Sequence, residues 1–85
     1  MTGPVKRSVT IAGHETSISL EPVFWEALKD AAAAAGLPLN ALIARIDAER
    51  IEHPDPPNLG SALRVWLFER ERARRQIKRD RGALD

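Results

Sequence analysis

The chain has 85 residues, a formal net charge of +1 and no cysteine. This length allows at most one domain, and the lack of cysteine excludes disulfides and thiolate metal ligands. The apolar share is 44%, but alanine supplies much of it, so a monomer would have a marginal core and dimerisation is the expected remedy. The sequence contains neither a membrane-length apolar run nor a signal-peptide core, so we expect a soluble, cytoplasmic protein.

A first strand is expected at residues 6–11, KRSVTI, after an N-terminal segment, residues 1–5, that we expect to be disordered. Apolar and polar residues alternate in this strand, which is the pattern of a strand with one buried face. In an alternative interpretation the segment stays loose and forms a basic arm that carries Lys6 and Arg7.

A second strand is expected at residues 16–20, TSISL, where apolar and hydroxyl side chains alternate in the same way. A turn over residues 12–15 would fold the first strand back on the second. Apolar residues would then share one face and hydroxyl residues the other. The pairs expected in this register are Ile11 with Thr16 and Val9 with Ile18.

Two helices are expected next, at about residues 21–35 and 39–50. Pro22 suits a first helical position because an amide hydrogen there would be unpaired, and Gly36 supplies the left-handed conformation that ends the first helix. Apolar residues recur at helical spacing in both helices and form an inward stripe on each. These residues are Phe24, Trp25, Leu28, Ala31, Ala32 and Ala35 in the first helix, and Leu39, Leu42, Ile43 and Ile46 in the second.

Residues 51–57, IEHPDPP, contain three prolines and are expected to form a linker. Asn58 then caps a third helix. After Phe68 the apolar stripe of this helix is nearly lost, so we expect the helix to project or fray before Gly82. The expected inner stripe consists of Leu59, Leu63, Trp66, Leu67 and Arg70.

Charge is distributed unevenly along the chain. Residues 1–63 carry five basic and eight acidic side chains, whereas residues 64–85 carry eight basic and four acidic ones. In one interpretation the basic end contacts phosphates, and in another it is a solvated helix end. His14 and His53 are isolated and the usual zinc spacings are absent. We therefore expect no metal site, no cofactor and no enzymatic activity.

Residues 6–68 resemble the ribbon-helix-helix family, small dimeric DNA-binding proteins such as the Arc and MetJ repressors. The resemblance rests on the alternating strand, the helix after it, the turn from Gly36 to Asn40 and the second apolar helix. The segments from Lys6 to His14 and from Asn58 to Val65 are similar to those of a bacterial subgroup. The resemblance implies a mainly α fold with a short N-terminal β-ribbon, in the order β-β-α-α-α, and an intertwined homodimer. Residues 69–85 would form a basic C-terminal extension beyond that domain.

In this family two antiparallel strands of the dimer enter the major groove and their outward side chains read bases. The matching outward positions are Glu15, Ser17 and Ser19, although a solvated sheet face is the alternative. Phosphate contacts are expected from Lys6 and Arg7 and from the helix N-terminus at Leu39 and Asn40. In the alternative, Asn40 only forms a hydrogen bond with the local backbone. The expected dimer core comprises Ile18, Leu20, Phe24, Trp25, Leu28, Leu42, Ile43 and Ile46.

Two functions follow from these observations. The first is a homodimeric DNA-binding transcriptional regulator of a bacterial cytoplasm. The second is a dimeric protein-interaction module, or an antitoxin-like protein, that keeps the fold with little or no DNA binding. The partners expected are a second copy of the chain, DNA, and in the second case another protein bound through the third helix or the basic tail; no membrane is expected.

Overall fold

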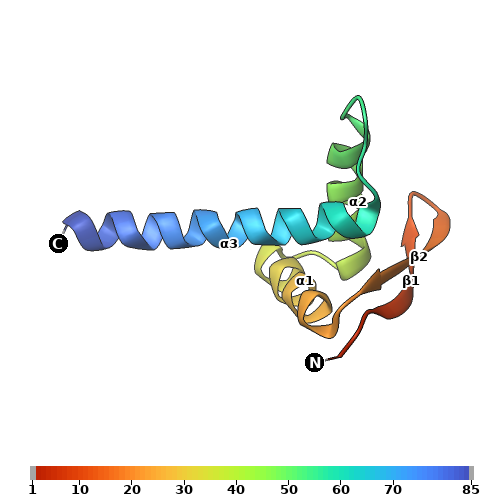
Figure 1. Cartoon of the computed structure of the whole chain (residues 1–85), viewed down its shortest axis with the longest axis horizontal. Helices are drawn as coiled ribbons and strands as arrows, with labels where there is room; N and C mark the ends of the chain where they lie inside the picture. Colours follow the sequence, from red (N-terminus) through yellow and green to blue (C-terminus); the bar gives the residue numbers. More distant parts are fainter. Residues whose placement is uncertain (1, 85) are drawn as a thin grey trace.

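A computed structural model describes residues 2–84 and shows an antiparallel hairpin followed by three helices (Figure 1). The elements are β1 (Val5–Ile11), β2 (His14–Leu20), α1 (Pro22–Ala35), α2 (Leu39–Ile51) and α3 (Leu59–Leu84). This mainly helical β-β-α-α-α order confirms the predicted fold class. Strand β1 begins at Val5, inside the segment expected to be disordered. Met1 of that segment and Asp85 of the predicted tail lie outside the described residues.

The hairpin turns at Ala12 and Gly13, whose φ angles are 50° and 81°. Two successive residues in the left-handed region make a two-residue turn of the kind that matches the twist of the strands. The predicted register is wrong by two residues, because the chain uses this shorter turn instead of one over residues 12–15. A shift by an even number keeps every side chain on its predicted face. The observed pairs include Ile11 with His14, Val9 with Thr16 and Arg7 with Ile18.

The helices begin and end where local signals place them. Pro22 occupies the start of α1, and Gly36 ends it with φ 69° while the Leu37 amide donates to the Ala32 carbonyl at 2.9 Å. The Oδ1 atom of Asn58 accepts a hydrogen bond from the Ser61 amide at 2.7 Å, which confirms the predicted cap of α3. Helix α2 extends to Ile51, one residue into the predicted linker.

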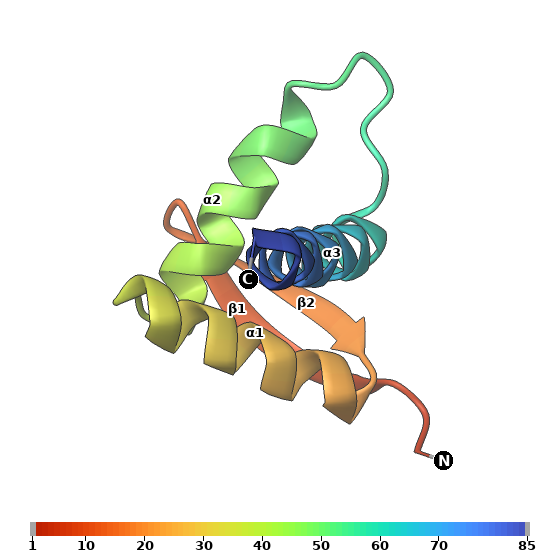
Figure 2. The same ribbon diagram turned by 90° about the vertical axis from the view of Figure 1, so that its left-hand side faces the viewer.

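The core lies between the inner face of the hairpin and all three helices (Figure 2). Helix α3 contributes to it directly, because Leu63 is fully buried and Leu67 is 7% exposed. Of the predicted inward residues, Ala35 is exposed and the prediction for it is wrong, since it lies in the last turn of α1, away from the core. The buried residues are Val9, Ile18, Leu20, Trp25, Leu28, Ala31, Ala32, Leu42, Ile43, Ile46, Leu63 and Leu67.

The residues predicted to form a dimer core are thus packed inside a single chain, with Phe24 only partly buried at its margin. Their contact with a second chain stays a prediction. Helix α3 continues through Gly82 to Leu84 and does not fray before Gly82. Its distal half extends away from the body on the side opposite the hairpin (Figure 1), and every side chain from Glu71 to Gly82 is exposed.

Candidate nucleic-acid interface

The outer face of the β1–β2 hairpin, defined here as the outer ribbon face, is polar and exposed along its whole length. It arises because period-two alternation sends every second side chain away from the helices. The cross-strand pairs on this face are Lys6 with Ser19, Ser8 with Ser17 and Thr10 with Glu15, and each of these side chains is exposed. The structure therefore brings the predicted residues Glu15, Ser17 and Ser19 together with Lys6, Ser8 and Thr10 of the same chain.

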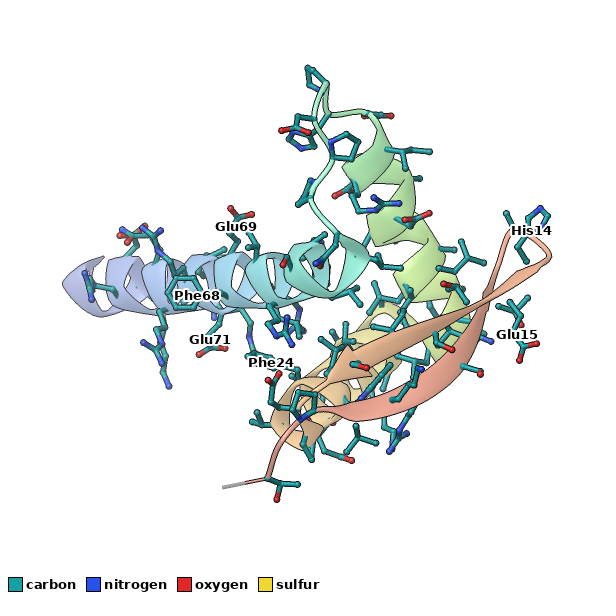
Figure 3. The ribbon with its side chains drawn as sticks, turned by 45° about the vertical axis from the view of Figure 1, so that its right-hand side comes forward. His14, Glu15, Phe24, Phe68, Glu69 and Glu71 are labelled. Carbon is teal, nitrogen blue, oxygen red and sulfur yellow. The ribbon has the colours of Figure 1, made fainter. Side chains whose placement is uncertain are left out.

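The chemistry of the outer ribbon face is dominated by hydroxyl groups, which both donate and accept hydrogen bonds. Its two charges lie apart: Lys6 is near the open end of the hairpin, and Glu15 is next to the turn (Figure 3). Serine and threonine hydroxyls can contact any base edge, whereas a glutamate in the major groove accepts from the cytosine amino group. This face therefore suits contact with bases, with Lys6 as its one cation.

Arg7 lies on the inner face of the hairpin, opposite Lys6, since it pairs with the buried residue Ile18. Its guanidinium carbon is 5.3 Å from the centroid of the Trp25 ring, a distance at which a cation is attracted by the ring face. The Trp25 Nε1 atom also donates to the Val5 carbonyl at 2.9 Å. The structure thus separates the predicted phosphate pair Lys6 and Arg7 onto two faces, and Arg7 supports the packing of β1 on α1.

The N-terminus of α2 lies at the far end of α1, which has 14 residues and a length of about 20 Å. The Pro38 carbonyl accepts from the Ala41 and Leu42 amides, each at 3.1 Å, so the helix begins without a side-chain cap. Leu39 is half-buried and Asn40 is exposed. Within the described residues the Asn40 side chain forms no hydrogen bond. The first amides of α2 are thus open to an anion, and the phosphate role of Leu39 and Asn40 stays a prediction.

Arg64 of α3 joins the third helix to the end of the ribbon, a contact that sequence reasoning missed. Its Nε and Nη2 atoms donate to Oε1 of Glu21 at 3.1 and 3.0 Å, and Nη2 lies 3.5 Å from the Ser19 carbonyl. The guanidinium carbon is also 5.7 Å from the centroid of the Phe24 ring. Because Glu21 and Arg64 are 43 residues apart, no local spacing could have indicated this pair.

The pKa of Glu21 is lowered from its ordinary value of 4.5, first by a hydrogen bond from its own backbone amide and then by the hydrogen bond from Arg64. Both favour the charged carboxylate. The Arg64 guanidinium therefore binds the Glu21 carboxylate and the Ser19 carbonyl, and these contacts hold the start of α3 beside strand β2.

The two histidines take no part in the outer ribbon face. His14 is exposed at the hairpin turn, and His53 lies beyond the end of α2. No three His, Asp or Glu side chains within residues 2–84 are grouped so as to hold a metal ion. In the same part of the chain none of the helices combines the length and apolar composition of a membrane crossing.

The model of the family described as "Ribbon-helix-helix domain" matches residues 4–70. No curated protein and no solved structure matched the chain. Proteins with this domain are generally DNA-binding transcription regulators or antitoxins, and the fold is a regulatory one without enzymatic activity. Because the matched residues include both strands, all of α1 and α2 and the packed part of α3, the chain belongs to the ribbon-helix-helix domain family.

Proposed function

We propose that this protein is a DNA-binding transcription regulator that places the β1–β2 hairpin in the major groove. The observation that carries the proposal is the outer ribbon face, which is polar and exposed over its full length while the other face packs on the helices. The major groove is about 12 Å wide and admits a two-stranded ribbon. In this placement Ser17, Ser19 and Glu15 face base edges, together with Ser8 and Thr10.

The phosphate contacts of the proposed complex come from three places. Lys6 reaches the backbone or a guanine from the open end of the hairpin. The amides of Leu39 and Asn40 offer a helix N-terminus, where unpaired donors and the helix dipole both favour an anion. Arg7 is exposed and reaches a phosphate only from the edge of β1, because its guanidinium lies over the Trp25 ring. This small set of cations predicts modest affinity that depends on salt.

We propose further that the regulator acts as a homodimer in a bacterial cytoplasm. The apolar side chains of Val5 and Val23 are 36% and 68% exposed. Val5 pairs with Leu20 at the end of β2, and α1, which carries Val23, begins two residues after Leu20. Exposed apolar side chains at this end of the ribbon are suited to contact with a second copy. In such a dimer each chain brings its own hairpin.

The test is binding of the purified protein to a fluorescent duplex of random sequence at low and moderate salt, with the oligomeric mass measured alongside. The variant Lys6→Ala should weaken binding and reduce the salt slope by about 1 for each bound chain, the value for one lost phosphate contact. Lys29→Ala removes the same charge from an exposed position on α1 and should leave binding unchanged. The outer ribbon face loses its proposed role if the Lys6 variant binds as tightly as the parent protein.

A protein-interaction module, including an antitoxin-like protein, is the second candidate, and one observation favours it. A groove of about 400 Å³ lies between α2, the linker and α3. Its apolar walls include Ile46, Val65 and Trp66, and Val65 is 55% exposed. Such a groove suits an apolar segment of another protein. Two results together would establish this candidate instead. The protein would not bind DNA even at low salt, and Val65→Asp would abolish binding to a partner protein.

A further inference from the structure

The distal part of α3 is a charged helix that packs against no other element among the residues that the structure describes. Residues 69–81 contain seven basic and three acidic side chains, a net charge of +4. All side chains from Glu71 to Gly82 are exposed, so no burial against the domain stabilises this part of the helix. A helix of this length is marginal in water without tertiary contacts. Its charge and exposure indicate a surface that acts through an external ligand.

The basic side chains form two rows along the helix, which we call the two basic rows. Arg72, Arg75 and Arg79 are spaced by three and four residues, and together with Phe68 they line one side. Arg74, Lys78 and Arg81 are spaced in the same way and line another side with Ile77. Residues at such spacing share a helix face. A third strip of the helix surface separates the two basic rows on one side of the helix and carries no basic residue. It consists of Glu69, Ala73, Gln76 and Asp80.

Only part of this positive charge is neutralised within the helix. The Oε1 atom of Glu71 accepts from Nε of Arg75 at 3.2 Å, and Oε2 lies 3.9 Å from Nη1 of Arg74. Glu69 and Glu71 project to opposite sides of the helix (Figure 3). Within residues 2–84, Arg72, Lys78 and Arg79 form no ion pair. Each row therefore keeps unpaired cations.

We propose that the two basic rows form a second nucleic-acid-binding surface, whose ligand is the phosphate backbone on both sides of a duplex groove. An acidic protein surface would meet a helix from one side, whereas a helix in a groove is flanked by phosphates on two sides. The major groove admits an α-helix, and a continuous basic helix is a known way to enter it. All but one of the cations in the two rows are arginine, which binds phosphate through two parallel hydrogen bonds.

The position of this surface makes it independent of the proposed ribbon contact. The hairpin and the tip of α3 lie at opposite ends of the long axis of the molecule (Figure 1), which measures 48 Å. One short duplex on the outer ribbon face would not reach the two basic rows. The two surfaces would therefore hold different duplex segments, and the inference does not require that the ribbon binds DNA.

The experiment compares full-length variants binding a short fluorescent duplex of random sequence over a range of salt. Arg72→Gln with Arg79→Gln removes two charges from one row, and Arg74→Gln with Lys78→Gln removes two from the other. Each double variant should reduce the salt slope by about 2, since each lost phosphate contact accounts for about 1. Glutamine keeps a good helix propensity, and circular dichroism verifies the helix content. Lys29→Gln with Arg45→Gln removes two exposed charges from the body and should leave the slope unchanged.

A ribbon variant, Lys6→Ala with Ser17→Ala and Ser19→Ala, separates this inference from the proposed function. If this variant keeps salt-sensitive binding that disappears when the α3 substitutions are added, the second surface is established. If the ribbon variant alone abolishes binding, the inference is overturned while the proposed function stands. If the α3 variants lose all binding while the ribbon variant binds fully, the proposed function fails and the inference stands. Tighter binding to polyglutamate than to the duplex would overturn the inference in favour of an acidic protein partner.

Discussion

Arg64 and Glu21 join the third helix to the point where the ribbon becomes the first helix, through two hydrogen bonds of 3.1 and 3.0 Å to the same carboxylate oxygen. Their side chains are 35% and 33% exposed, so solvent screens the pair and its strength depends on hydrogen-bond geometry. Because Glu21 precedes α1 and Arg64 lies in the second turn of α3, the pair sets the position of α3 relative to the hairpin.

The Glu21 carboxylate should make stability depend on pH. Its pKa is lowered in the folded protein from the ordinary value of 4.5, so its contribution is present above pH 4.5 and is lost as the pH falls through the lowered value. In Glu21→Gln the melting temperature should be lower than in the parent protein at neutral pH, and the difference should shrink below pH 4.5. A pH series of thermal unfolding measures this. The control Glu26→Gln removes an exposed carboxylate from α1 and should give a smaller difference. A gap that stays constant down to acidic pH would contradict the prediction.

Asparagine at position 12 should stabilise the hairpin turn. Ala12 adopts φ 50°, which costs an L-residue about 1 to 2 kcal/mol unless, as in asparagine, a short polar side chain compensates. Ala12→Asn creates the Asn-Gly pair preferred in two-residue hairpin turns and should raise the free energy of unfolding by up to about 1 kcal/mol. Gly13→Ala should lower it, because φ there is 81°. Urea unfolding compares the three proteins, and a stable Gly13→Ala variant would argue against this turn.

Lys6 and Arg7 should have separable effects although they are adjacent. Arg7→Ala removes the contact with the Trp25 ring and should lower the free energy of unfolding by about 0.5 to 1 kcal/mol, the usual value for such an exposed contact. Lys6→Ala lies on the outer ribbon face and should leave stability unchanged within about 0.5 kcal/mol. Chemical unfolding of both variants measures the difference. Equal destabilisation would mean that the two side chains do not lie on opposite faces.

The first part of α3 should behave as core and the next turn as surface. Leu63 is fully buried whereas Phe68 is 65% exposed. Leu63→Ala should lower the free energy of unfolding by about 2 to 5 kcal/mol, because it leaves a cavity in the core. Phe68→Ala, although it removes a larger side chain, should change it by less than about 0.5 kcal/mol. If both substitutions were neutral in urea unfolding, α3 would not be part of the domain core.

The sequence by itself determined the elements and their faces. Period-two alternation is a property of consecutive residues, so it placed Ser17 and Ser19 on the exposed face and Ile18 on the buried one without knowledge of the register. The same locality explains the correct ends of the helices at Pro22, Gly36 and Asn58, whose capping chemistry acts within one turn.

Only the tertiary structure decided how these elements fit together. The two-residue turn at Ala12 and Gly13 set the register, because alanine carries no signal for a left-handed conformation. The position of Arg7 over Trp25 depended on β1 packing against α1, and a basic residue in a strand does not reveal that it covers an aromatic ring. The pair of Arg64 with Glu21 depended on a contact between residues 43 positions apart in the chain, which no periodic pattern encodes. The loss of the apolar stripe after Phe68 predicted that α3 would project or fray, and the structure decided that it projects as a continuous helix.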